Sequence, residues 1–384
     1  MKILRVEFDK IGLFTEGFSI DFTAQDHVFD HAYAKNITPK VYSLNSIAIL
    51  GINASGKSTA LRLIDLAMQV VLKHESLNNC KIPFGIIKNG SIMKVDFFHN
   101  EKFYQLVSTI GVREALSDET LDNQIKYYFE NEVLYMKNKS SVQSKKQTFV
   151  YQSSHEFKNR KLEKSEYLQE DDSIVMAVTK NNATSYYNTF ITTNFNIYYP
   201  MSFANAKLIN LFDDSIEKID YDYKEDKTMQ VHFKNSESPV ECDTMHPSQQ
   251  VLSSGTIRGS SLLELVAITI KNGGYLAIDE IENHMHKRLV QTIIGFFNDE
   301  EINKKGATLI FSTHYSEVID TLERKDNVYF LTRNQEYSSE VKRYSDYINR
   351  VEPKKSEVFL SNYIKGTAPS YDAIKKVRDY LCQL

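Results

Sequence analysis

Short apolar runs and amphipathic stretches alternate in the first part of the chain. Residues 3–8 and 18–22 place apolar side chains at alternating or neighbouring positions, which predicts two strands. Residues 47–50 form an apolar, β-branched run that is typical of a buried parallel strand. Residues 60–72 follow with apolar side chains on one stripe of a helix. The pattern predicts a strand–turn–helix unit here.

The last third of the chain is equally regular. Residues 262–270 predict an apolar helix, residues 275–278 and 308–311 predict buried strands, and residues 289–297 predict a helix between them. A final amphipathic helix is predicted over 370–384. This alternation of strands and helices indicates an α/β fold whose sheet is mostly parallel and covered by helices on both faces.

The middle of the chain has a mixed pattern without a heptad repeat, which excludes a long coiled coil. Its predicted elements are a hairpin of 92–98 and 102–108, a strand pair of 132–136 and 147–151, and a helix over 174–199. We therefore divide the chain into a first lobe, 1–79, a mixed insert, 80–245, and a second lobe, 246–384.

Composition and charge narrow the class of protein. The hydrophobic fraction of 42% and the charged fraction of 25% are those of a globular protein that can bury a sizeable core. The net charge of −4 argues against a protein that coats DNA with a generally basic surface. The net charge does not exclude a local basic patch. The run 137–146 is either a solvated hairpin tip or a phosphate-binding patch.

The cysteines and the apolar runs indicate where in the cell the protein is expected. Cys80, Cys242 and Cys382 are isolated and show no C-x-x-C spacing, so a disulfide framework is not expected. The first residues carry charges within their apolar run, unlike a signal peptide, and no apolar stretch approaches ~18 residues. We expect a cytoplasmic protein without a membrane contact.

The run 51–58 reads Gly-Ile-Asn-Ala-Ser-Gly-Lys-Ser and matches the phosphate-binding pattern G-x-x-x-x-G-K-[ST]. It lies between the predicted strand and helix, where backbone N–H groups and the helix dipole converge on one spot. Lys57 would reach the β- and γ-phosphates, and Ser58 would offer its hydroxyl to Mg²⁺. The predicted nucleotide-binding residues are Gly51, Asn53, Ala54, Ser55, Gly56, Lys57, Ser58 and Thr59.

Three further motifs follow in the second lobe. Asp279 and Glu280 end an apolar strand, where Asp279 would hold Mg²⁺ and Glu280 would act as general base. His314 ends the next buried strand and would contact the γ-phosphate. The run 253–255, Ser-Ser-Gly, precedes a predicted helix and is either an anion site or a simple N-cap; the motif alone does not decide.

This order of motifs resembles the ABC-type ATPases of the SMC, RecF and OLD group. The resemblance implies a P-loop ATPase head with an N-terminal antiparallel β part and a mixed α/β insert. In that family the signature of one subunit completes the nucleotide site of another. The resemblance therefore implies that Ser253, Ser254 and Gly255 contact the γ-phosphate across a head-to-tail dimer. The family's D-loop matches Asn283, His284 and His286.

Details of these motifs are similar to stand-alone OLD-like ATPases of bacterial anti-phage defence. They are the histidine in the D-loop, the Gly-Thr pair at 255–256 and the closing segment 363–369. The signature departs from the family because Ser254 occupies a glycine position. The family's Q-loop has three candidates in this chain, which are Gln143, Gln147 and Gln152.

The resemblance implies an ATP-binding and ATP-hydrolysing switch that needs Mg²⁺ and assembles head to tail into a homodimer or a larger assembly. It further implies the ATPase component of an anti-phage, toxin–antitoxin-like system. Such a component acts with a separate effector, a nuclease or toxin, and has a phage protein or nucleic acid as its trigger. Two alternatives stay open: a RecF-like DNA-binding ATPase in DNA repair, and a scaffold that ATP stabilises.

Overall fold

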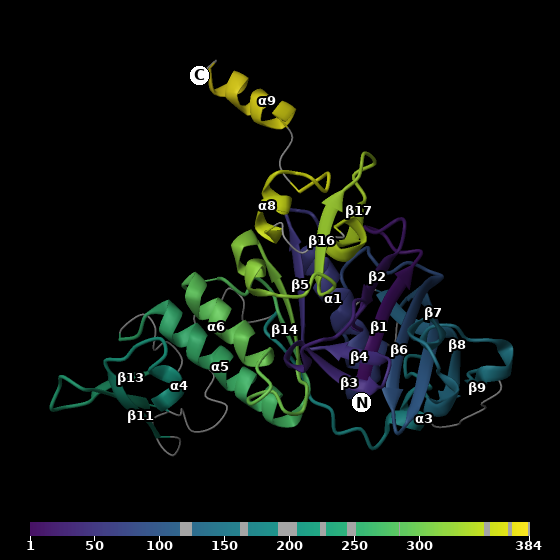
Figure 1. Ribbon diagram of the computed structural model, residues 1–384, viewed down its shortest axis with the longest axis horizontal. Helices are drawn as coiled ribbons and strands as arrows, with labels where there is room; N and C mark the ends of the chain where they lie inside the picture. Colours follow the sequence, from purple (N-terminus) through teal and green to yellow (C-terminus); the bar gives the residue numbers. More distant parts are fainter. Residues whose placement is uncertain are drawn as a thin grey trace.

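Two six-stranded sheets, with helices packed between and beside them, form the body of the computed structural model (Figure 1). Segments distant in sequence lie together in both sheets. The structure describes residues 1–115, 125–161, 168–190, 206–222, 228–243, 251–283, 285–348, 354–367 and 371–382. Within these ranges, no helix is both long enough and apolar enough to cross a membrane.

The first sheet is antiparallel throughout and has the order β2-β1-β6-β7-β8-β9. Its strands are β1 (Lys2–Asp9), β2 (Phe18–Asp21), β6 (Ser91–His99), β7 (Lys102–Glu114), β8 (Ile125–Asn138) and β9 (Glu156–Asn159). The predicted hairpin of 92–98 and 102–108 is confirmed, because β6 pairs with β7 and their register closes at His99 and Lys102. Much of the segment 80–245 thus shares one sheet with the N-terminal strands.

The second sheet has the order β10-β14-β15-β5-β16-β17, and its strands are parallel except for β17. These strands are β5 (Ser46–Gly51), β10 (Tyr186–Asn188), β14 (Tyr275–Ile278), β15 (Thr308–Thr313), β16 (Val328–Arg333) and β17 (Ser339–Arg343). Every residue of β5, β14 and β15 is buried. Their uniformly apolar or small sequences fit a sheet that is covered on both faces.

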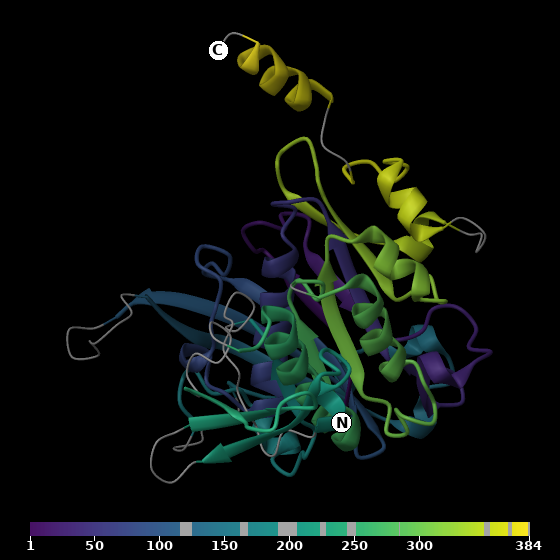
Figure 2. The ribbon, with the colours of Figure 1, turned by 90° about the vertical axis from the view of Figure 1, so that its left-hand side faces the viewer.

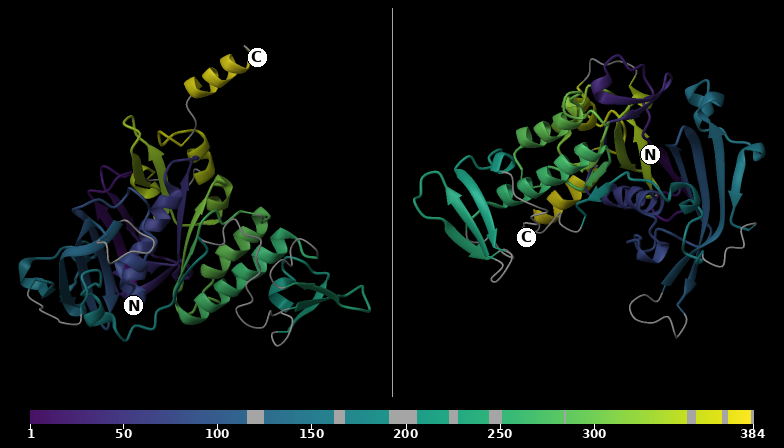
Figure 3. Two further views of the ribbon diagram at one scale, coloured as in Figure 1. Left: turned by 180° about the vertical axis from the view of Figure 1, so that it is seen from behind. Right: turned by 90° about the horizontal axis from the view of Figure 1, so that it is seen from below.

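Three long helices provide this cover (Figure 3). They are α1 (Lys57–Met68), α5 (Ser254–Asn272) and α6 (Lys287–Phe297). Side chains of α1 share a core with both sheets, so α1 lies between them, whereas α5 and α6 pack on the opposite face of the parallel sheet. A π-helical turn, Gln69–Lys73, extends α1. α5 ends at Asn272, and the next residue, Gly273, has a φ of 71° that suits glycine.

The predicted helix over 174–199 is wrong in its described part. Only α3 (Met176–Thr179) is helical, and Tyr186–Asn188 forms β10 beside β14. Two contacts explain the strand: it completes the hydrogen bonding of the sheet edge, and the buried Tyr186 hydroxyl donates to Asp65 Oδ1 at 2.6 Å. Tertiary pairing overrides local propensity here. Residues 191–199 lie outside the described residues.

The predicted strand over 147–151 is also wrong. Lys145–Thr148 forms a helical turn, α2, which Ser144 and Gln147 close with a capping box. β8 pairs with β9 instead. The Lys137 side chain is only 7% exposed, and its ammonium donates to the carbonyls of Gln147, Thr148 and Val150, so the alternative of a solvated tip fails at this residue. Burial lowers the pKa of Lys137 to about 8.

A small third sheet packs beside the start of α5, on the left of Figure 1. It consists of β11 (Ile216–Asp222), β12 (Thr228–Phe233) and β13 (Val240–Asp243), next to the turn α4 (Ala206–Ile209). Leu252 and Ile257 share its core, and Gly259 lets the Phe212 ring approach α5 closely, because a Cβ at 259 would overlap that ring. The start of α5 is therefore held by this sheet.

The remaining elements lie at the periphery. β3 (Ala34–Thr38) and β4 (Val41–Leu44) form a hairpin, and β3 lies in the polar stretch 23–40, where the sequence pattern predicts a loop. α7 (Tyr344–Tyr347) and α8 (Lys355–Leu360) follow β17. α9 (Tyr371–Leu381) agrees with the predicted final helix and extends away from the body (Figure 2).

Candidate functional site

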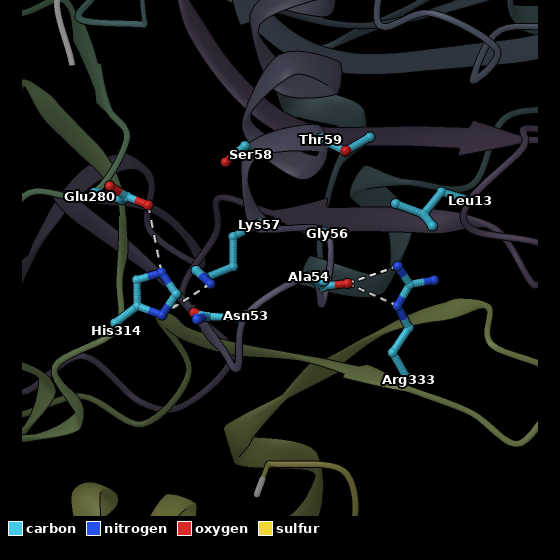
Figure 4. Close-up of a pocket in the computed structure, with 10 residues that line it drawn as sticks. All are labelled: Leu13, Asn53, Ala54, Gly56, Lys57, Ser58, Thr59, Glu280, His314 and Arg333. Atoms are coloured by element: carbon cyan, nitrogen blue, oxygen red, sulfur yellow. Dashed lines mark hydrogen bonds and ion pairs between the residues drawn. The ribbon is translucent and has the colours of Figure 1, made fainter. Parts of the chain in front are cut away.

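A polar cleft of about 480 Å³ opens where β5 leads into α1, at the carboxyl ends of the central parallel strands (Figure 4). Ligands bind at this edge in open α/β sheets. The cleft is lined by Leu13, Asn53, Ala54, Gly56, Lys57, Ser58, Thr59, Glu280, His314 and Arg333. It thus joins six of the predicted nucleotide-binding residues with two predicted catalytic residues from other strands.

Two glycines allow the loop between β5 and α1 to adopt its backbone conformation. Gly56 has a φ of 101° and precedes α1 without any side-chain cap, so the first N–H groups of the helix stay open toward the cleft. Gly51 lies at the other end of the loop, where a Cβ would lie 2.7 Å from the Leu331 carbonyl oxygen and would overlap Ser55. Gly51 and Ser55 shape the loop from outside the cleft, and the open N–H groups suit an anion.

Lys57 lies at the centre of the cleft with only 6% of its surface exposed. Its Nζ donates to the carbonyl oxygens of Gly51 at 2.9 Å and Ile52 at 3.3 Å, and lies 3.4 Å from His314 Nδ1. Burial lowers the pKa of Lys57, while the nearby carboxylates, chiefly Asp279 and Glu280, oppose that shift. The ammonium is folded back on its own loop, within reach of an anion in the cleft.

Glu280 and His314 face Lys57 across the cleft (Figure 4). Glu280 follows β14 with a φ of 49°, and its N–H donates to Ser312 Oγ at 2.8 Å. His314 follows β15, and its Nε2 lies 3.6 Å from Glu280 Oε1. The imidazole therefore bridges the carboxylate and the Lys57 ammonium. Adjacent parallel strands bring these residues together, although 34 positions separate 280 from 314 in the sequence.

The oxygen donors predicted to hold Mg²⁺ come from two sides. The Ser58 side chain lines the cleft at the start of α1. Asp279 follows β14 and directly precedes Glu280, and its Oδ1 accepts a hydrogen bond of 2.5 Å from Ser312 Oγ. Hydroxyl and carboxylate oxygens are hard ligands of the kind that Mg²⁺ takes together with substrate phosphates. The chemistry of this donor set fits Mg²⁺.

Sequence reasoning missed Glu282. This side chain is 8% exposed, and its Oε1 accepts the His314 N–H at 2.7 Å, so it fixes the backbone that presents the imidazole. Its Oε2 is buried and makes no hydrogen bond to any part of the chain that the structure describes. Arg258 of α5 donates to the Glu280 carbonyl at 3.1 Å and braces the same turn. Glu282 stands two positions after Glu280, and this spacing is the sequence signal that could have identified it.

Leu13 and Arg333 were missed as well. Leu13 belongs to the connection between β1 and β2, and Arg333 ends β16, so neither lies near a recognised motif in the sequence. The Arg333 guanidinium donates from Nε and Nη2 to the Ala54 carbonyl at 2.9 and 2.7 Å. It therefore lies directly against the phosphate-binding loop.

The predicted signature residues lie outside this cleft. Ser253 precedes α5, and its Oγ accepts the Thr256 N–H at 3.0 Å, so the N-cap alternative describes its contact within the chain. Ser254 and Gly255 form the first turn of the helix. None of the three lines the cleft of its own chain.

The predicted D-loop residues lie just after Glu280. The Asn283 N–H donates to the Glu280 carbonyl at 3.0 Å, which closes the turn after β14. His286 caps α6, because its Nδ1 accepts the Arg288 N–H at 3.2 Å. His284 lies outside the described residues. The contacts of Asn283 and His286 shape the path from β14 to α6.

The model of a protein family matches less than half of the chain. The model of a family described as "AAA domain, putative AbiEii toxin, Type IV TA system" matches residues 138–320. The match supports an AAA-type P-loop ATPase. No curated protein matches the chain.

The matched segment and the phosphate-binding loop are separate evidence for a P-loop ATPase. Residues 138–320 include Asp279, Glu280 and His314 but begin after the loop 51–58. In the structure the two parts meet in one cleft, since Lys57 lies beside His314. The sequence motif, the family match and the fold thus agree with a protein of the P-loop ATPase class.

Proposed function

We propose that this chain is a Mg²⁺-dependent ATPase that works as a nucleotide-controlled switch. One observation carries the proposal: the open N-terminus of α1 and the Lys57 ammonium share a cleft with the carboxylate of Glu280 and the imidazole of His314. The first pair suits a polyphosphate, and the second suits a water molecule attacking its last phosphorus.

Binding begins with Lys57. When a triphosphate enters, the ammonium exchanges its contacts with Gly51, Ile52 and His314 for the β- and γ-phosphate oxygens. The N–H groups from Gly56 to Thr59 point at the same phosphates. Ser58 and Asp279 would hold Mg²⁺, which neutralises charge on the phosphate oxygens when bound.

Hydrolysis then uses Glu280 and His314. The Glu280 carboxylate accepts a proton from water while the water oxygen bonds to the γ-phosphorus and the bond from that phosphorus to the β–γ bridging oxygen breaks. ADP and phosphate result. His314 lies between Glu280 and Lys57, so its ring N–H can donate to a γ-phosphate oxygen and report whether that group is present.

Removal of the metal tests this proposal. We expect the purified chain to release phosphate from ATP in Mg²⁺, and we expect EDTA to reduce that release to background, because the phosphate charge is then not neutralised. Addition of excess Mg²⁺ should restore the activity, which serves as the control for EDTA damage. Phosphate release that is unchanged in EDTA would contradict the roles of Ser58 and Asp279.

A second copy of the chain is the proposed partner of the ATP-bound state. Ser253 is exposed at the start of α5, and the first turn of that helix lies away from the cleft of its own chain. A helix N-terminus of this length suits a phosphate presented by another molecule. These features support a head-to-tail assembly in which Ser253, Ser254 and Gly255 contact the partner's γ-phosphate.

The biological setting is proposed from the family description. The matching family is described in terms of a toxin and a Type IV toxin–antitoxin system. We therefore propose that the switch works in the cytoplasm with a separate effector protein, a nuclease or toxin, in defence against phage. A phage protein or nucleic acid would act as the trigger.

Glu282 supplies a test of how His314 is positioned. Glu282→Ala removes the acceptor of the His314 N–H, so we expect about a 10-fold fall in kcat with little change in ATP affinity. Glu282→Gln keeps an acceptor oxygen and should retain most of the activity. Steady-state kinetics and equilibrium binding separate the two effects, with thermal melting as the check on folding. Full turnover in the alanine variant would remove Glu282 from the mechanism.

A further inference from the structure

The end of the cleft opposite Glu280 and His314 is formed by Leu13 and Arg333 (Figure 4). The residues between the two ends are those of the phosphate-binding loop and the first turn of α1. The cleft is therefore polar and charged at one end, lined by phosphate-binding groups in the middle, and bounded by an aliphatic side chain and a guanidinium at the other end.

Hydrogen bonds from the edges of the Arg333 guanidinium hold the side chain in a fixed orientation. Nε and Nη2 both donate to the Ala54 carbonyl, and Nη1 donates to the Tyr337 carbonyl on the turn between β16 and β17. These bonds use the N–H groups along the edges of the planar guanidinium. A planar guanidinium with occupied edges is suited to stacking on a flat ring.

Leu13 is equally fixed. Its carbonyl accepts the Ser339 N–H at 2.9 Å and the Ser338 hydroxyl at 3.0 Å, which ties the β1–β2 connection to the β16–β17 hairpin. The Leu13 Cδ2 atom would lie 3.0 Å from a Cβ at Gly56, so the side chain lies directly against the phosphate-binding loop. The two residues thus belong to one preformed unit with that loop.

The polarity of the cleft orients a bound nucleotide. Under the proposed function, the γ-phosphate lies near Glu280 and His314, so the triphosphate runs along the loop and the nucleoside emerges at the other end. There it meets Leu13 and Arg333. The lining residues with a side-chain amide or carboxylate are Asn53 and Glu280, and Figure 4 draws both on the side of Lys57 away from Leu13 and Arg333. The Thr59 hydroxyl, which Figure 4 draws near Leu13, can both donate and accept, so it fits the edge of adenine and that of guanine alike.

We propose that Leu13 and Arg333 form the nucleoside end of the cleft and hold a purine ring by apolar contact and stacking, without reading its hydrogen-bonding edge. The ligand class is therefore purine nucleoside triphosphates, with ATP and GTP bound alike. Sites that hydrogen-bond a substrate reject the wrong one by about 10⁴-fold or more, whereas apolar contact discriminates far less. This inference rests on the proposed function and specifies the substrate of the same site.

The test compares three probes by equilibrium titration in the Glu280→Gln background, where turnover is slow: MgATP, MgGTP and magnesium tripolyphosphate. We expect the Kd values of ATP and GTP to agree within about 10-fold. Arg333→Ala and Leu13→Ala should each weaken both nucleotides by about 5-fold or more, and should leave tripolyphosphate affinity within about twofold. Tripolyphosphate reports the phosphate loop without a nucleoside.

Two further variants sharpen the result. Arg333→Lys keeps the charge but lacks the planar face, so it should bind nucleotides as weakly as the alanine variant. Lys342→Ala, which removes a cation of the same hairpin outside the cleft, should leave all three Kd values unchanged.

Three outcomes would overturn this inference but not the proposed function. The first is a preference for ATP over GTP above about 10³-fold. The second is an equal loss of tripolyphosphate and nucleotide affinity in Arg333→Ala, and the third is full nucleotide affinity in Arg333→Lys. The second outcome would mean that Arg333 acts only by its hydrogen bonds to the Ala54 carbonyl. Failure of the parent protein to bind either tripolyphosphate or nucleotide would overturn the proposed function and this inference with it.

Discussion

Glu280→Gln is expected to reduce ATP turnover by about 10²- to 10⁴-fold while nucleotide binding persists. The amide has nearly the shape of the carboxylate but cannot accept the proton of the attacking water. The backbone of residue 280 should stay in place, because its N–H is held by Ser312 Oγ and its carbonyl by Arg258. The variant thus separates chemistry from binding, and phosphate release measures the loss.

The same variant should also trap an assembled state. If ATP joins two copies and hydrolysis releases them, slow hydrolysis will accumulate an ATP-bound dimer or larger species, which size-exclusion chromatography with light scattering can measure. Glu317→Gln is a matched control, because Glu317 is an exposed carboxylate three residues after His314 and outside the cleft. Turnover at the parent rate in Glu280→Gln would end the assignment of Glu280 as general base.

Lys57→Ala is expected to weaken ATP binding by about 10- to 100-fold and to abolish ATP-dependent assembly. Lys57 is the one lysine that lines the described part of the cleft, and charge-assisted hydrogen bonds contribute about 1.5–3 kcal/mol each. Titration with MgATP measures the affinity, and light scattering with and without ATP measures the assembly.

Folding of the Lys57 variant needs its own check, since the side chain also bonds to the carbonyls of Gly51 and Ile52. Thermal melting without nucleotide gives that check. Lys81→Ala, which removes an exposed lysine from the chain after α1, is the control and should bind as the parent does. Parent-level affinity in a folded Lys57→Ala protein would contradict the phosphate-binding role of the loop.

Elements with strong local signals agree with the structure. The apolar runs that end at Gly51, Asp279 and His314 become adjacent strands of one parallel sheet, because each is apolar enough to be buried on both faces. Since parallel strands end at the same edge, the polar residues after them converge on one cleft. The positions of Lys57, Glu280 and His314 followed from this rule.

Elements in the middle of the chain were predicted less well. Tyr186–Asn188 has no local pattern that separates a strand from a helix, and its partner β14 lies about 90 residues later in the sequence. Likewise, the carbonyl partners that bury the Lys137 ammonium lie on a turn whose fold depends on a capping box. Such contacts join segments that no short sequence window contains.

The sequence by itself determined which residues carry the chemistry that we propose for this protein: a loop of the phosphate-binding pattern between a strand and a helix, and carboxylates and a histidine at strand ends. These depend on local conformation and on periodic burial, which short segments encode. Only the tertiary structure decided which other residues complete the site. Glu282 acts through the backbone of His314, and Arg333 reaches Ala54 from a strand almost 280 residues away, so their roles arise from contacts that form only when β5, β14, β15 and β16 assemble into one sheet.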